Sequence, residues 1–306
     1  MSFPVVLWQL YGPILVNYRH LYHAGNFADV LKHVLLVQLV RALQRKEKGL
    51  LLLDTHAGRG GYDLSRAAAG DTLARRPEHP DGIGRLEAAP NLPPAIADYL
   101  GLVRAYQGRH RGPRSAEEGP GLRFYPGSPW LLRLLARPQD RLAFWELHPQ
   151  ECEALRISLG RSPHQAIQEA DGYRAIESLL PPPERRGLIL LDPPYEAAGE
   201  WTQVVEAVRA GLRRFPSGTY AIWYPVTDRA GPDAFLEGLA ALDLPPTLVA
   251  ELVVNPPGPG LRGCGVAILN PPWQFEAEAE ASLRALLPLL RRHPEADAGL
   301  RWLAPE

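Results

Sequence analysis

Short apolar runs alternate with segments of helical periodicity along most of the chain. Continuous apolar runs of this length are typical of strands buried on both faces of a sheet. Such runs occur at 50–54, 141–146, 187–191, 219–226, 248–255 and 265–270, and residues 165–171, followed by Gly172 and Tyr173, are interpreted as a further strand and its loop. Between them apolar residues recur at helical spacing, as at positions 30, 31, 34, 35, 39 and 43 of segment 28–48. The pattern predicts an α/β, Rossmann-like fold with a seven-stranded sheet.

The spacing of the strands indicates an insertion. Three βαβ units take roughly 90 residues, and the chain exceeds this by about forty between Gly58 and Asp192. The surplus fits best at 66–123, where Pro, Gly and Arg are frequent and the helical pattern is confined to short pieces such as 94–106. We expect a small helical subdomain there, inserted into a domain that spans 17–306. Its arginines 104, 109, 111, 114 and 123 are consistent with an RNA-binding surface or with an ordinary solvated one.

Composition restricts the setting of the protein. The formal net charge is −1 over 306 residues, so charge neither supports nor excludes RNA as a partner. Cys152 and Cys264 have no paired spacing, which argues against disulfides and against zinc, so we expect a cytoplasmic protein without a metal. The apolar segment 1–16 lacks the basic start and the cleavage site of a signal peptide. No apolar run approaches the roughly 20 residues of a membrane span, so no membrane association is expected.

The run 187–191 leads directly into the candidate chemistry, because the sequence GLILLDPPY fills positions 187–195. Proline cannot continue a central strand, so Asp192 and Tyr195 are expected at the carboxyl edge of a parallel sheet, where open α/β folds bind ligands. An apolar strand that ends in D-P-P-Y resembles the motif found in methyltransferases that modify the exocyclic amine of adenine. We expect Asp192 and the Pro193 carbonyl to accept hydrogen bonds from that amine, and Tyr195 to stack on the flipped base. A rigid turn with a capping aspartate is the purely structural alternative.

Other strand ends carry residues suited to a nucleotide-like cofactor. Glycines 58, 60 and 61 follow the first strand and allow a ligand to approach the backbone closely. Glu146 closes the second strand, where an acid can bind ribose hydroxyls, and Asp171 and Gly172 follow the third, where an aspartate can bind an adenine amine. Ser128 is expected to cap a helix at 131–135. A second candidate, NPPW at 270–273, ends the last strand and is not expected to face this site.

Taken in order, the motifs are similar to those of the RlmJ family, which methylates N6 of one adenine in 23S ribosomal RNA. They are YRHLYHAGNFADVLKH, LDTHAGRGGY, YPGSP, ELHP, ADG, RRGLILLDPPYE, GTYAIWYP and LNPPW. The resemblance implies the seven-stranded class I methyltransferase fold, S-adenosylmethionine as methyl donor and 23S ribosomal RNA as partner. No helix with an obvious association surface is visible in the sequence, so we expect a monomer. Matched by position, it implies a catalytic Asp192, an RNA contact at Tyr18, and cofactor contacts at His33, His56, Ser128, Glu146, Asp171, Gly172 and Asp192.

The cofactor contact of His33 and the interpretation of segment 1–16 depend on the resemblance alone. The position of His33 on the inward face of a helix predicts a hydrogen-bonded core histidine, whereas the resemblance implies a cofactor contact. Members of the family begin close to the YRH motif, so segment 1–16 is expected to be an N-terminal extension or the product of a start codon assigned too early.

Three rival functions follow from the same motifs. A DNA adenine-N6 methyltransferase would share the site, but no helix-turn-helix or similar module is visible, so DNA is not expected as a partner. A non-catalytic RNA-binding or cofactor-binding protein of the same fold is disfavoured by the intact residues 192–195. A glutamine methyltransferase built around N-P-P-Y is disfavoured because the first residue here is Asp192.

Overall fold

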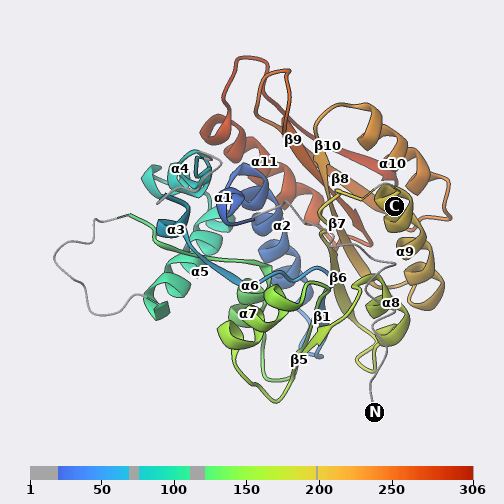
Figure 1. Cartoon of the computed structure of the whole chain (residues 1–306). Coiled ribbons are helices and arrows are strands. Elements are labelled where there is room, and N and C mark those ends of the chain that lie inside the picture. The colour runs from blue at the N-terminus through green and yellow to red at the C-terminus, as the bar shows by residue number, and fades with distance from the viewer. Residues whose placement is uncertain (1–19, 69–75, 111–120, 198, 306) are drawn as a thin grey trace, which may run out of the picture.

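An eight-stranded sheet forms the centre of the computed structural model, which describes residues 20–68, 76–110, 121–197 and 199–305 (Figure 1). The strand order is β10-β8-β9-β7-β6-β1-β4-β5. The neighbours from β5 to β7 are parallel, whereas β9 lies antiparallel between β7 and β8. The strands are β1 (Leu51–Asp54), β4 (Arg141–Glu146), β5 (Gln165–Glu169), β6 (Gly187–Leu191), β7 (Thr219–Val226), β8 (Thr247–Val253), β9 (Gly263–Leu269) and β10 (Asp297–Ala304).

The α/β class and the antiparallel end of the sheet are confirmed, but the predicted number of seven strands is wrong by one. The additional strand is β10, which pairs antiparallel with β8 at the edge of the sheet. Its sequence, DAGLRWLA, alternates between exposed and partly buried positions and contains no long apolar run. β10 is thus a half-exposed edge strand without the continuous apolar run that marks the central strands.

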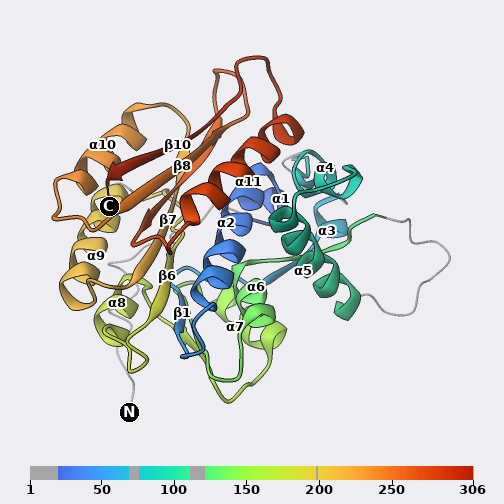
Figure 2. The same cartoon turned by 180° about the vertical axis from the view of Figure 1, so that it is seen from behind.

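Helices cover both faces of the sheet (Figures 1 and 2). One face packs against α2 (Phe27–Leu43), α6 (Ser128–Leu135), α7 (Pro149–Leu159) and α11 (Phe275–Leu290), and the other against α8 (Tyr173–Leu179), α9 (Glu200–Arg214) and α10 (Ala230–Ala240). Successive side chains of a strand alternate between the faces, so Leu52 joins the α2 side whereas Leu51 and Leu53 join the α9 side.

Helix α2 is buried along nearly its whole length. The side chain of Asn26 caps it by accepting hydrogen bonds from the N–H groups of Ala28 and Asp29 at 2.9 and 3.0 Å. The sheet, α6, α5 (Pro94–His110) and α11 surround the helix, which explains why it is apolar on several sides. A charged residue on this helix consequently lies in the protein interior and requires a charged partner.

The described part of segment 66–123 is mainly helical. It contains the end of α3 (Leu64–Ala68), then η2 (His79–Asp81), α4 (Ile83–Ala88) and α5. The antiparallel strands β2 (Gly61–Asp63) and β3 (Phe124–Pro126) join its two ends. Its buried side chains, including Ile83 and Tyr99, belong to the same apolar cluster as α2. A separate subdomain at 66–123 remains a prediction. No helix in the described ranges is both long and apolar enough to span a bilayer.

Candidate active site

Asp192 lies at the carboxyl edge of the sheet, directly after β6, which runs between β1 and β7. Its side chain is 15% exposed, and its Oδ2 lies 2.5 Å from Nζ of Lys32, which belongs to α2. The same Nζ lies 2.9 Å from Oδ1 of Asp29, whose side chain is buried. Burial alone lowers the pKa of Lys32, but the carboxylates of Asp192 and Asp29 outweigh it and hold that pKa well above its usual value. Lys32 is therefore a cation fixed between two carboxylates.

Lys32 is not among the site residues predicted from the sequence. The signal for it was a lysine flanked by Leu31 and His33 on the inward side of an apolar helix, which is an unfavourable position unless the charge is paired. Its partner Asp192 is 160 residues away in sequence, so this pairing is not visible in any local pattern.

Asp54 ends β1 beside this ion pair and is fully buried. Burial raises the pKa of Asp54 to about 7; the Ser128 hydroxyl opposes this rise and the carboxylate of Asp192 adds to it. Its Oδ1 accepts a hydrogen bond from the His56 N–H at 3.2 Å. Its Oδ2 has no hydrogen-bond partner of normal geometry within the described ranges of the chain. An unsatisfied buried carboxylate oxygen at a sheet edge is suited to a cationic or hydrogen-bonding ligand.

Ser128 is placed differently from its predicted capping role. Helix α6 begins at Ser128, its N-cap is Gly127 in an extended conformation, and no side chain caps it. Pro129 fits the first turn, where a missing N–H costs nothing, so the helix starts three residues before the predicted position. The prediction that Ser128 caps a helix at 131–135 is therefore wrong. The buried Ser128 hydroxyl instead favours the carboxylate form of Asp54 and so opposes the rise of its pKa.

The glycine loop after β1 is fastened to Glu146 at the end of β4. Glu146 accepts hydrogen bonds from the Gly58 N–H at 2.8 Å and from the His148 N–H at 2.7 Å. Gly58 has a φ of 59° and Gly60 a φ of 81°, the left-handed region that favours glycine. Burial raises the pKa of Glu146, and the two backbone donors oppose that rise. The glycine loop and Glu146 are therefore held together by a hydrogen bond at the carboxyl edge of the sheet.

Residues 171–173 pack directly against the residues that follow β1. A Cβ atom on Gly172 would lie 1.8 Å from the Thr55 carbonyl oxygen, so only glycine fits there. Asp171 accepts a hydrogen bond from the Tyr173 N–H at 2.9 Å, and the Tyr173 ring meets the edge of His56 with centroids 5.0 Å apart. Burial lowers the pKa of His56 to about 4, so this imidazole is neutral near pH 7. His56, Asp171 and Gly172 thus lie side by side, although their binding roles remain predictions.

His33 belongs to a buried hydrogen-bonded network. Its side chain is on α2 and is 1% exposed, and its Nδ1 lies 2.8 Å from the Tyr125 hydroxyl. The Tyr125 hydroxyl lies 2.8 Å from that of Tyr99 on α5. These contacts agree with the core histidine expected from its position, and contact with a cofactor remains a prediction.

Tyr195 is held in place by two tryptophans. Its φ is 55°, and its hydroxyl donates to the Trp223 carbonyl at 2.8 Å. Its ring centroid lies 4.3 Å from that of Trp201 and 6.0 Å from that of Trp223, so part of its surface is already covered. Pro193 is buried beside it. Stacking of a base on Tyr195 remains a prediction, and Tyr18 lies outside the described residues.

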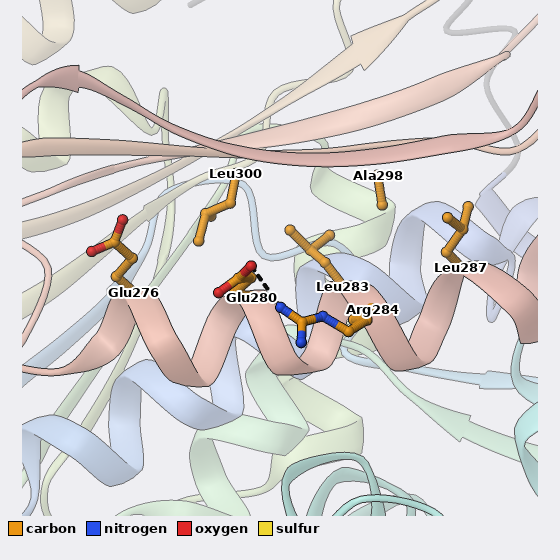
Figure 3. A pocket seen from close by; sticks show the side chains of 7 residues that line it. All are labelled: Glu276, Glu280, Leu283, Arg284, Leu287, Ala298 and Leu300. Atoms are coloured by element: carbon orange, nitrogen blue, oxygen red, sulfur yellow. Dashed lines mark hydrogen bonds and ion pairs between the residues drawn. The ribbon is translucent and has the colours of Figure 1, made fainter.

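Two other features lie away from this edge. Asn270, the first residue of NPPW, follows β9 and therefore lies at the opposite edge of the sheet, because β9 is antiparallel to β7. A cavity of about 330 Å³ between α11 and β10 is lined by Glu276, Glu280, Leu283, Arg284, Leu287, Ala298 and Leu300 (Figure 3). It is separated from β6 by β8, β9 and β7, and it contains none of the predicted site residues.

Comparison with known proteins connects this geometry to one family. Residues 47–304 match the model described as "Ribosomal RNA large subunit methyltransferase D, RlmJ". Curated proteins named Ribosomal RNA large subunit methyltransferase J, from Haemophilus influenzae and Escherichia coli K12, are each 37% identical over 294 residues, which cover 95% of this chain and 100% of theirs. A crystal structure of a Legionella pneumophila protein aligns with a TM-score of 0.78 and 34% identity over 91% of this chain and 98% of that one.

Proposed function

Because the chain belongs to the RlmJ family of ribosomal RNA large subunit methyltransferases, we propose that it transfers a methyl group from S-adenosylmethionine to N6 of one adenine in 23S ribosomal RNA. The observation that supports this reaction best is the position of Asp192, at the carboxyl edge of β6 and in an ion pair with the buried Lys32. A carboxylate held in this way, near the acids Asp54, Glu146 and Asp171 that could bind the cofactor, suits the methylation of a weakly nucleophilic amine.

The residues around the glycine loop fit the proposed methyl donor. Glu146 would accept hydrogen bonds from ribose hydroxyls, and Asp171 with the Gly172 backbone would hold the adenine ring. The buried Asp54 Oδ2, which has no partner of normal geometry among the described residues, would accept from the ammonium of the methionine part. S-adenosylmethionine, when bound, supplies a methyl group made electrophilic by the sulfonium. The described residues thus offer acceptors for the ribose hydroxyls, the adenine amine and the ammonium of this molecule.

Asp192 orients the target amine. The lone pair of an adenine N6 is delocalised into the ring, so the nitrogen becomes nucleophilic only when it turns tetrahedral. The Asp192 carboxylate and the Pro193 carbonyl accept from the two amine hydrogens and favour that geometry. As the methyl group moves from sulfur to nitrogen, positive charge develops on N6, and the Asp192 carboxylate stabilises it. The extra proton on N6 then leaves to water.

Lys32 and Tyr195 support this step in different ways. An ammonium 2.5 Å from Asp192 favours its carboxylate form and fixes the side chain in one orientation. Tyr195 stacks on the adenine after it has left the RNA stack, and the hydroxyl bond to Trp223 fixes the tyrosine ring. Tyr18 contacts the RNA, His33, His56 and Ser128 contact the cofactor, and the enzyme works as a monomer in the cytoplasm.

Substitution of Asp192 by asparagine tests this assignment. Asp192→Asn should keep affinity for S-adenosylmethionine within about tenfold and lower the single-turnover transfer rate on the order of a hundredfold or more. Calorimetric titration gives the affinity, and rapid quenching with 23S ribosomal RNA gives the rate. Asp297→Asn, an exposed substitution at the start of β10, is the matched control and should leave both unchanged. An Asp192→Asn enzyme with near wild-type turnover would show that the carboxylate does not perform this role.

A further inference from the structure

Exposed cations gather at the edge of the sheet opposite Asp192. Strands β1, β6 and β7 are parallel neighbours, so the segments that enter them meet at one edge. These segments carry exposed cations, and no carboxylate lies within 4.0 Å of any of them in the described parts of the chain. We call them the far-edge cluster: Lys46 and Lys48 before β1, Arg185 before β6, and Arg213 and Arg214 at the end of α9.

The acids at this edge leave the cluster with a positive excess. Asp140 is paired with Arg137, Glu184 with Arg141, and Glu278 with Arg45. Glu47, Asp243 and Glu276 are exposed at the same edge and belong to no ion pair among the described residues, so the five cations of the cluster outnumber these three carboxylates. The whole chain has a formal net charge of −1. Positive charge is therefore concentrated here relative to the rest of the molecule.

Two further arginines fix the backbone that carries the cluster. Arg186 donates to the Lys48 and Leu43 carbonyls, each at 2.5 Å. Arg137 donates to the Gln44 carbonyl at 3.1 Å and to the Lys46 carbonyl at 3.0 Å. These bonds satisfy carbonyls at and after the end of α2 and hold the segment of Lys46 and Lys48 in one conformation. Burial lowers the pKa of Arg186, and the nearby Arg137 adds to this effect, so the two guanidinium groups lie close to each other.

Trp273 adds an aromatic surface to the same edge. Its side chain is 74% exposed and belongs to the NPPW segment. The Asn270 side chain donates to the Pro216 and Gly218 carbonyls, both at 2.8 Å, just beyond Arg214. Arg45, just beyond α2, donates to the Trp273 carbonyl at 3.5 Å. The segment that carries the indole thus lies between the cations that follow α2 and those that end α9.

From these contacts we infer that the far-edge cluster and Trp273 form a second RNA-binding surface for the same ribosomal RNA substrate. The cations contact backbone phosphates, and the indole stacks on one unpaired base. This inference rests on the proposed function. Strand β6 has five residues at about 3.3 Å each, so the surface lies roughly 15–20 Å from Asp192. Only a substrate larger than the nucleotides around the target adenine reaches both places, which would favour folded 23S ribosomal RNA over short RNA.

Charge removal tests this inference. The test variant carries Lys46→Ala, Lys48→Ala, Arg213→Ala and Arg214→Ala, and the control variant removes four exposed arginines elsewhere: Arg156→Ala, Arg209→Ala, Arg284→Ala and Arg301→Ala. Filter binding to protein-free 23S ribosomal RNA at about 150 mM salt should show at least a tenfold weaker affinity for the test variant only. The slope of log affinity against log salt should fall by about 2–3. Trp273→Ala alone should weaken binding by about tenfold.

Turnover separates this surface from the active site. On 23S ribosomal RNA the test variant should raise KM and keep kcat, and on an RNA of about 15 nucleotides around the mapped adenine it should match the wild type. Equal binding by the test and control variants would overturn the second surface. If the wild type methylates neither RNA, the proposed function fails, while the binding comparison still decides whether the surface contacts RNA.

Discussion

Removal of the Lys32 ammonium tests the ion pair on which the proposed mechanism depends. The Lys32 side chain is 7% exposed, and its Nζ lies 2.5 Å from Asp192 and 2.9 Å from Asp29. Lys32→Met keeps a similar length without the charge, so it leaves two largely buried carboxylates near each other. Breaking a buried ion pair in this way typically costs about 3–5 kcal/mol. We expect the free energy of unfolding at pH 8 to fall by about that amount in urea titrations.

A matched control lies on the same helix. Arg41 pairs with Asp98 at 2.9 Å, but these side chains are 51% and 39% exposed, so Arg41→Met should cost less than about 1 kcal/mol. The double variant Lys32→Met/Asp192→Asn should recover part of the loss, because one of the two carboxylates is then neutral. The pKa of Lys32 is raised, so its contribution is fully present below pH 10.5 and is lost above that value.

Lys32→Met should also lower the methyl-transfer rate of the molecules that remain folded. Where it remains folded, as checked by circular dichroism, Lys32→Met should lower the single-turnover methyl-transfer rate at least about tenfold at saturating donor. The reasoning would be refuted if Lys32→Met were no more destabilising than Arg41→Met and retained wild-type turnover. That result would mean that Asp192 is held and charged without the ammonium.

Three further substitutions probe the cofactor side of the site. Asp54→Asn should flatten the dependence of the free energy of unfolding on pH. The pKa of Asp54 is about 7 in the folded protein and 3.8 for an ordinary aspartate, so the protonated side chain stabilises the fold below about pH 4, and this contribution is lost as pH rises through about 7. Urea titrations at pH 5, 6.5 and 8 measure this, and parallel profiles for the two proteins would disprove it. Gly172→Ala places a Cβ 1.8 Å from the Thr55 carbonyl oxygen and should lower the free energy of unfolding by at least about 1–3 kcal/mol, as measured by thermal unfolding. Gly101→Ala is the control, because its Cβ would meet no atom within 4 Å, and it should not lower the stability. Glu146→Gln should weaken S-adenosylmethionine binding about tenfold or more by calorimetry, and unchanged affinity would mean that the carboxylate only anchors the glycine loop.

The main chain of the site was predictable because its signals are local. The central parallel strands β1, β4 and β6 are largely apolar runs, and each run ends where the chain reaches an acidic residue: Asp54, Glu146 or Asp192. Parallel strands bring these ends to one edge, so the approximate positions of the acids and of the glycine loop followed from the sequence. The same reasoning put Asn270 at a different place from Asp192, and the antiparallel register of β9 agrees with it.

What the sequence did not reveal depends on contacts between distant segments. Lys32 meets Asp192 across 160 residues, and no spacing rule connects a position on α2 to the end of β6. Asp54 was recognised as the end of a strand, but its raised pKa arises from burial and from Asp192, both tertiary effects. Ser128 has a residue type that commonly caps helices, but Pro129 allowed the helix to begin earlier, and this local competition changed its role.

The most direct test of the proposed function is methyl transfer to defined substrates. The protein is incubated with radiolabelled S-adenosylmethionine and protein-free 23S ribosomal RNA from a strain that lacks the enzyme, with duplex DNA and ribosomal protein in parallel. We expect label in the RNA alone, recovered as N6-methyladenosine at a single position. Label confined to DNA, or no transfer to any substrate despite measurable binding of the donor, would contradict the proposed function.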